Sequence, residues 1–211
     1  MKFYAPWIDE KTREHHLLRA PQRLQTPLFQ EVASTLQERH ALLDRFSTLE
    51  NNMLIFSLLT LHAEDLEQIF HNIYQRLAPG GLFMGATFGN NTLKELRMLF
   101  QTVEEERAGS ITPRFCPLPS GPHIVNILQN QGFKDIVVDQ EFYRGEYTNL
   151  QSLYYELRMM GETNCLKNRR QGLTTPRFFE ACESFHRSHF SKDGKFFVSF
   201  EIIYITAWKA L

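Results

Sequence analysis

Glycine is missing from the first 79 residues of this 211-residue chain, and all 11 glycines lie from Gly80 onward. Four of them fall in one stretch, LAPGGLFMGATFGNN, at residues 77–91. Turns that bring the backbone close to a nucleotide need glycine, because a side chain would block the approach. A glycine-rich nucleotide loop is therefore excluded from the N-terminal part of the sequence.

The segment GGLFMGAT, read from Gly80, resembles a phosphate-binding loop of the pattern G-x-x-x-x-G-K-[ST], but Ala86 replaces the lysine. Alanine cannot neutralise a phosphate, and the glycines here follow an expected helix and precede an expected strand, which reverses the motif. We interpret Pro79-Gly80-Gly81 as a helix-to-strand turn. No G-x-G-x-x-G occurs, so a dinucleotide fingerprint is absent too.

Metal and nucleophile motifs are also missing. The sequence has no C-x-x-C, H-E-x-x-H or G-x-S-x-G, so we expect no metal site and can name no catalytic residue. Glu183-x-x-His186 and His186-x-x-His189 are incomplete motifs, and we interpret their histidines as solvated or partly buried. Cys165 is either a reactive thiol in a polar loop or, as we prefer, a structural cysteine.

The net charge, the short apolar runs and the N-terminal residues argue against further classes of protein. A net charge of −1 favours neither nucleic acid nor an anionic membrane surface. No apolar run reaches the roughly 18 residues of a membrane span, and the acidic residues near the N-terminus fit no leader peptide. The three cysteines are odd in number and far apart in the sequence, which suits a reducing compartment. We expect a cytoplasmic protein that binds neither nucleic acid nor membrane.

Hydrophobic periodicity predicts alternating helices and strands. An N-terminal helical segment is expected over residues 1–52 and an α/β domain over 53–211. Alternation from residue 53 to about 150 favours a mostly parallel sheet, and a turn before the last strand would make that strand antiparallel. Capping boxes are expected at Thr92-x-x-Glu95 and Thr148-x-x-Gln151. The expected strands cover residues 53–62, 81–88, 133–143 and 195–210.

One polar segment, MMGETNCLKNRRQG at residues 159–172, follows an expected helix end. Its arginines suit carboxylate or phosphate groups, and its asparagines can orient polar groups. A C-cap followed by a solvated loop explains the same residues and is the simpler interpretation. The spacing alone leaves both open.

Several of these segments resemble a known family. RLAPGGLFMGATFGNNTLKELR, ITPRFCPLPS, MMGETNCLKNRR and FEIIYITAWKA resemble the C-terminal half of class I S-adenosylmethionine-dependent methyltransferases. The likeness is closest to the biotin-synthesis malonyl-carrier-protein methyltransferases and the mitochondrial complex I assembly-factor homologues. It rests on F-G-x-x-T-L-x-E-L-R from Phe88 and M-G-x-x-N-C-x-x-N-R from Met160.

The resemblance implies a truncated Rossmann-like sheet whose strands correspond to strands four to seven of the family, with flanking helices. In the family, three strands and the cofactor-binding glycine loop lie between the N-terminal helix and strand four. Here only STLENN, residues 47–52, separates them. The resemblance therefore implies that the cofactor half is missing, and no cofactor-binding residue can be assigned.

Two hypotheses follow from this resemblance. In the first, the protein is a degenerate binding or assembly factor that does not bind S-adenosylmethionine unaided. In the second, a partner chain or self-association completes the sheet and restores S-adenosylmethionine-dependent methyl transfer. A gene remnant is a third, minor explanation. In either main case we expect the substrate or partner site to use the following residues: Thr87, Asn91, Arg97, Asn164, Asn168 and Arg169.

Overall fold

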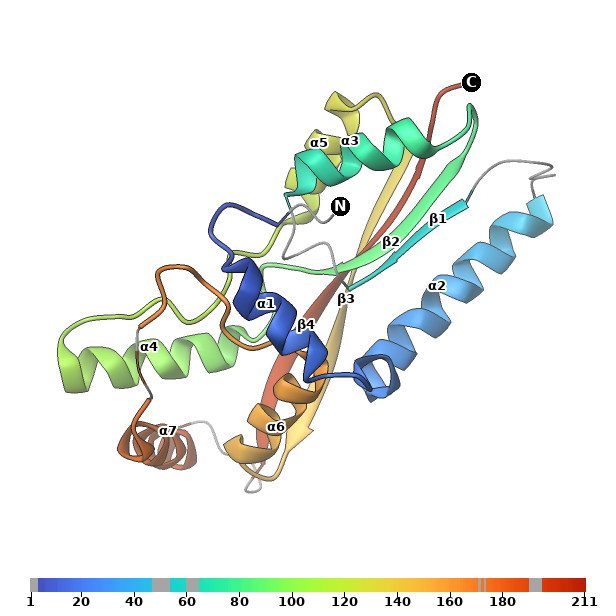
Figure 1. Cartoon of the computed structure of the whole chain (residues 1–211). Coiled ribbons are helices and arrows are strands. Elements are labelled where there is room, and N and C mark those ends of the chain that lie inside the picture. The colour runs from blue at the N-terminus through green and yellow to red at the C-terminus, as the bar shows by residue number, and fades with distance from the viewer. Residues whose placement is uncertain (1–3, 47–53, 60–64, 171, 173, 190–194) are drawn as a thin grey trace.

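The computed structural model describes residues 4–46, 54–59, 65–170, 172, 174–189 and 195–211 (Figure 1). In chain order the elements are α1 (Glu10–Leu18), the 3-10 helix η1 (Arg23–Gln25), α2 (Pro27–Phe46), β1 (Leu54–Leu58), α3 (Leu66–Arg76), β2 (Leu82–Phe88), α4 (Lys94–Ala108), α5 (Gly121–Asn130), β3 (Lys134–Tyr147), α6 (Leu150–Met160), α7 (Pro176–His189) and β4 (Phe196–Trp208). Among these helices none is both long and apolar enough to cross a bilayer.

The strands form one four-stranded sheet in the order β1-β2-β4-β3. β1 and β2 are parallel, and β4 lies antiparallel between β2 and β3. The prediction of an antiparallel last strand is confirmed. The expectation of a mostly parallel sheet holds for strand direction, since only β4 is reversed, but it is wrong for pairing, because β4 separates β2 from β3 and leaves one parallel pair.

Helices cover both faces of this sheet, as Figure 1 shows. Alternate residues of β2 enter different cores: Met84 packs into a cluster with α2, α4, α6 and α7, while Phe83 packs into a cluster with α3 and α5. Tyr204 and Ile205 of β4 divide in the same way. Strands buried on both faces need apolar residues at successive positions, which explains the continuous apolar runs in their sequences.

The glycines that end two helices were predicted correctly, whereas the capping boxes at two helix starts were not. Gly109 and Gly161 end α4 and α6 with φ values of 61° and 75°, as predicted for C-terminal glycines. Both predicted capping boxes are wrong. α6 is capped by Asn149, whose side chain accepts from the Ser152 N–H, and α4 follows Leu93 with no side-chain cap.

The α4 box residues instead attach the helix to β4. The Thr92 hydroxyl donates to the Glu201 carbonyl at 3.0 Å and accepts from the Glu201 N–H at 3.1 Å. The Glu95 carboxylate accepts from the Ser199 N–H at 2.9 Å and from its hydroxyl at 2.7 Å. A pattern typical of a local cap thus serves a tertiary contact with a neighbouring strand.

Replacing Glu95 with alanine should therefore destabilise the fold. The substitution leaves the Ser199 N–H, in a half-buried position, without its acceptor, which costs about 1–2 kcal/mol. Urea denaturation of E95A should show this loss in the free energy of unfolding. Glu106→Ala, an exposed position on the same helix, is the control and should change stability by less than about 0.5 kcal/mol. Equal stability of E95A and E106A would contradict the attachment.

Candidate functional site

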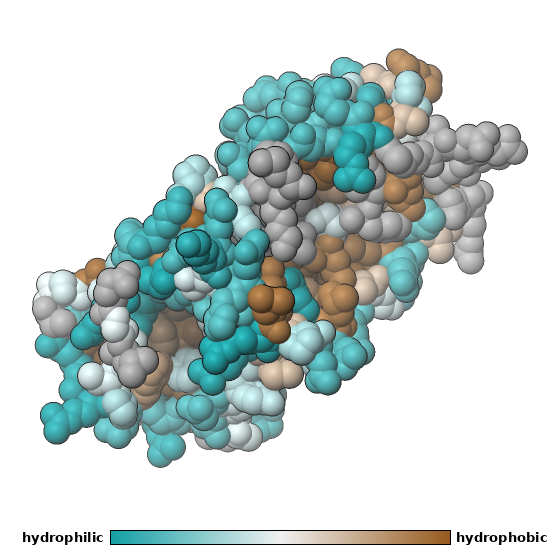
Figure 2. Space-filling model, in the orientation of Figure 1, coloured by the Kyte–Doolittle hydropathy of each residue, from teal (hydrophilic) through white to brown (hydrophobic). Residues whose placement is uncertain are grey.

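A cavity of about 290 Å³ lies beside the end of β2, and its walls come from segments spread along the chain from α1 to β4. Figure 2 shows brown, apolar atoms at the floor of a hollow between α4 and the loop that follows α6. The lining is mostly apolar and aromatic, with four arginines. It consists of Arg13, Phe88, Thr92, Leu93, Leu96, Arg97, Phe100, Arg114, Phe115, Cys116, Leu118, Tyr154, Leu157, Arg158, Met160, Glu162, Thr163, Asn164, Cys165, Phe179 and Phe200.

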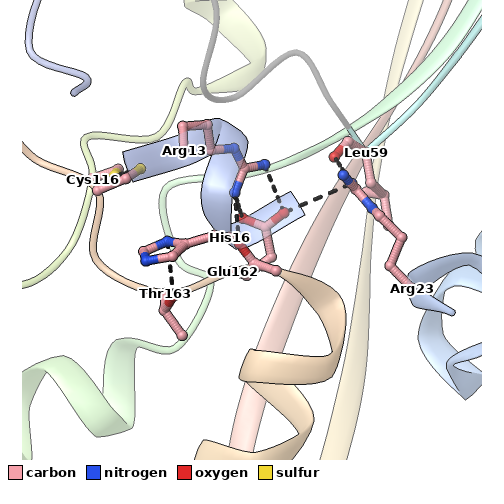
Figure 3. Close-up of polar contacts among 9 residues, drawn as sticks. Arg13, His16, Arg23, Leu59, Cys116, Glu162 and Thr163 are labelled. Carbon is pink, nitrogen blue, oxygen red and sulfur yellow. Dashed lines mark hydrogen bonds and ion pairs between the residues drawn. The ribbon is translucent and has the colours of Figure 1, made fainter. Parts of the chain in front are cut away.

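A buried ion pair closes one side of the cavity. Arg13 of α1 is only 2% exposed and meets the Glu162 carboxylate with both terminal nitrogens, at 2.9 and 3.0 Å. It also donates to the Gly161 carbonyl at 2.8 Å, and Figure 3 shows Arg23 reaching the same carboxylate from another side. Burial alone would lower the pKa of Arg13, but the Glu162 carboxylate more than offsets it and raises that pKa.

Arg97 of α4 is held differently. Its terminal nitrogens reach the carbonyls of Asn90 and Thr92 at 3.5 Å, the outer limit of a hydrogen bond. Its guanidinium carbon lies 5.6 Å from the centre of the Phe115 ring. Its Nε is buried and has no hydrogen-bond partner among the described residues. Arg97 is thus a positioned cation whose donors are not saturated.

Tyr154 of α6 brings a second unsatisfied donor to the cavity. Its hydroxyl is buried without a hydrogen-bond partner in the described part of the chain, and burial raises its pKa well above the usual range. Arg114, in contrast, already has partners in the protein. Its Nε donates to Glu104 at 2.7 Å, and its guanidinium carbon lies over the Phe178 ring, 4.4 Å from the ring centre. Among the buried groups of the cavity lining, Arg97 and Tyr154 therefore have hydrogen-bond donors without an acceptor.

The structure brings two of the six predicted site residues, Arg97 and Asn164, to this cavity. The Asn164 amide is occupied, since it donates to the Pro113 carbonyl at 3.0 Å and accepts from the Leu166 N–H at 3.1 Å. These two hydrogen bonds fix the Asn164 side chain in the cavity wall and leave its amide few donors or acceptors for a ligand.

The other four predicted residues lie outside the lining. Thr87 is fully buried in β2, and Asn91 is exposed on the β2–α4 turn. Asn168 is exposed, and Arg169 joins the Asp9 carboxylate at 2.9 Å and the Thr12 hydroxyl at 2.9 Å. Their part in binding a substrate or partner stays a prediction.

Sequence reasoning missed Arg13, Tyr154 and the pair formed by Cys116 and Cys165. Arg13 stands in a polar helix 149 positions away from Glu162, so no local pattern reveals the pairing. The two sulfurs lie 3.8 Å apart although 49 positions separate them in the chain. Tyr154 was visible only as a member of an amphipathic helix.

No protein-family model matches the chain. Human "Arginine-hydroxylase NDUFAF5, mitochondrial" is 32% identical over 157 residues, covering 74% of this chain and 46% of the human protein. The "Malonyl-[acyl-carrier protein] O-methyltransferase" of Xylella fastidiosa is 36% identical over 155 residues, covering 73% of this chain and 50% of that enzyme. The chain thus spans about half the length of the curated relatives it matches.

Solved structures resemble the fold more distantly. The YcgJ protein of Bacillus subtilis matches with a TM-score of 0.42 and 11% identity, over 88% of this chain and 80% of that one. Phosphoethanolamine N-methyltransferase 2 of Haemonchus contortus matches with a TM-score of 0.36 and 19% identity, over 75% of this chain and 33% of that one.

The two sequence relatives are the two groups to which the motifs from Phe88 and Met160 point. The four strands of the sheet are the segments that resemble strands four to seven of the family, which confirms the predicted fold class. The chain therefore belongs to the class I S-adenosylmethionine-dependent methyltransferase family, in the subgroup that holds the malonyl-carrier-protein methyltransferases and NDUFAF5.

Proposed function

We propose that this protein is a non-catalytic binding or assembly member of the methyltransferase family. It binds, in the cavity between α4 and α6, an apolar group that carries a carboxylate or carbonyl oxygen. It does not bind S-adenosylmethionine unaided. The observation that carries this proposal is the presence of two buried donors without acceptors, Arg97 Nε and the Tyr154 hydroxyl, in one apolar cavity.

Unsatisfied donors support a ligand because each one costs about 1–3 kcal/mol when it is buried without an acceptor. Ligand oxygens that accept from these groups would remove that cost. The surrounding rings, including Phe100 and Phe115, suit an apolar body such as an acyl chain. Both relatives carry names that involve a polar group, an arginine in one and a malonyl group in the other, but the reactions that the names give differ. We therefore base the proposed ligand on the residues of the cavity and not on the name of either relative.

The residues present do not fit S-adenosylmethionine. Its binding requires a strand-to-helix turn whose glycines let the backbone approach the cofactor. Gly89 is the one glycine in the β2–α4 turn, and the space beside it is filled, because a Cβ there would lie 2.5 Å from the Glu201 carboxyl carbon. The β1–α3 and β3–α6 connections contain no glycine. No catalytic step can be derived through this cofactor.

Calorimetry with S-adenosylmethionine and with S-adenosylhomocysteine tests the cofactor part of the proposal. The purified chain should give no saturable heat of binding with either compound at concentrations up to the millimolar range. Saturable binding with a micromolar dissociation constant would sink the proposal, because it would require an adenosine site that the glycine pattern does not provide.

The ligand part is tested with octanoate, whose apolar chain and carboxylate match the cavity, and with octanol as the uncharged probe. Arg97→Met should weaken octanoate binding about tenfold or more, because it removes a charged donor in a partly desolvated position. Tyr154→Phe should weaken octanoate binding while leaving the stability of the free protein unchanged or higher, since the lost hydroxyl has no partner.

Arg158→Met is the matched control. Arg158 also lines the cavity, but its side chain is exposed, and an exposed charge contributes little to binding in water. R158M should therefore bind octanoate nearly as well as the unaltered chain. If R97M and R158M lose affinity equally, or if neither binds less tightly, Arg97 is not the ligand group.

A second function is favoured by the edge of the sheet. β1 pairs only with β2 in the described part of the sheet, and Figure 2 shows brown, apolar atoms over this edge. An edge strand offers backbone groups to another chain, so a partner or a second copy that adds strands beside β1 would complete a methyltransferase sheet. Light scattering for self-association, and methyl-transfer assays on any complex recovered, test this alternative. A monomer that recruits no partner would count against it.

The cellular location also stays open to experiment. A cytoplasmic protein is the prediction from the sequence, whereas the human relative is named as mitochondrial. Location does not change the expected chemistry of the cavity.

A further inference from the structure

Two of the three cysteines meet in the wall of the cavity. Cys116 comes from the proline-rich loop between α4 and α5, and Cys165 comes from the loop after α6. Their sulfur atoms lie 3.8 Å apart, which is contact distance for two thiols that are not bonded to each other. The third cysteine, Cys182, is buried in α7 and is not part of the cavity lining.

The approach of the two thiols is fixed by their surroundings. The Asn164 amide donates to the Pro113 carbonyl at 3.0 Å and so joins the two loops directly. The Cys165 carbonyl accepts from the Asp9 N–H at 2.8 Å, and both cysteines pack with Ala5 and Ile8 of the N-terminal segment. The two loops are therefore held together independently of the sulfur atoms, and a bond would bring the sulfurs from 3.8 Å to about 2 Å.

The two cysteines differ in exposure and charge. Cys116 is half-buried, whereas Cys165 is 2% exposed. The hydrogen bond from the Cys165 thiol lowers the pKa of Cys116, and the Arg13 guanidinium acts in the same direction. The hydrogen bond to Cys116 and burial raise the pKa of Cys165. Cys116 is therefore the more accessible thiol and the one that ionises first.

We propose that Cys116 and Cys165 form a redox-active dithiol, which a small-molecule disulfide such as oxidised glutathione converts into a disulfide across the cavity wall. The Cys116 thiolate attacks one sulfur of oxidised glutathione, forms a mixed disulfide and releases one glutathione thiolate. Cys165 then loses its proton to solvent and attacks the Cys116 sulfur, which releases the second glutathione thiolate. The protein loses two electrons and two protons, and one oxidised glutathione becomes two reduced ones.

The bond would connect the proline-rich loop to the loop after α6 in the wall that also carries Arg13 and Asn164. It would close a long loop of the chain and restrict the unfolded state. The oxidised protein should therefore unfold at a temperature about 5–10 °C higher than the reduced protein. The link is reversible, since dithiothreitol would restore both thiols.

The experiment incubates the reduced 211-residue chain with oxidised glutathione and follows intact mass, thiol count and peptide map. The expected product has lost two hydrogens, retains one free thiol at Cys182 and contains a Cys116–Cys165 peptide link. Cys165→Ser should instead accumulate one stable glutathione adduct on Cys116, because the resolving thiol is gone. Cys182→Ser should form the disulfide like the unaltered protein.

Three results would overturn the proposal. The first is a stable glutathione adduct on Cys116 of the unaltered protein with no internal link. The second is modification of Cys182 as fast as Cys116. The third is a peptide map that links Cys182 to either of the other cysteines. Because the unaltered protein reports on all three, the proposal remains testable even if a serine variant folds poorly.

Discussion

The buried ion pair between Arg13 and Glu162 is the interaction on which the cavity side of this molecule depends. It joins α1, near the start of the chain, to the residue that directly follows the α6 C-cap glycine. Asn164 and Cys165 follow within three positions, so the same contact sets the place of the polar wall. A buried charge pair adds little net stability by itself, but leaving either member unpaired is costly. The pair therefore helps to specify where α1 packs, together with the contacts of Asp9 with Cys165 and Arg169.

The sheet provides the frame for this wall. β2 and β4 are buried on both faces, and α4 is fastened to β4 through the side chains of Thr92 and Glu95. This attachment holds α4, with Arg97 two positions after Glu95, against the end of β2. The position of Arg97 in the cavity lining thus follows from contacts between side chains of the α4 start and a strand that is far away in the sequence.

The elements could be predicted from the sequence because they follow from local periodicity and from glycines such as Gly109 and Gly161 at helix ends. The first residues of α4 could not, since Thr92 and Glu95 fit a capping box and only the fold reveals that β4 competes for them. Arg97 and Asn164, which were predicted from motifs, lie in the lining of the cavity. Arg13, Tyr154 and the Cys116–Cys165 contact were not predicted, because each depends on packing between segments that no sequence spacing encodes.

Family membership fixes the fold of this chain but not its reaction, since one relative is named as a hydroxylase and another as a methyltransferase. What the chain offers of its own is an apolar cavity with donors, closed by α1. A double-mutant cycle tests that closure most directly: urea unfolding of R13M, E162M and the variant with both changes. We expect each single change to cost about 3–5 kcal/mol and the double variant to lose at least about 1 kcal/mol less than their sum. Losses that simply add would mean that the pair does not hold α1 against the cavity.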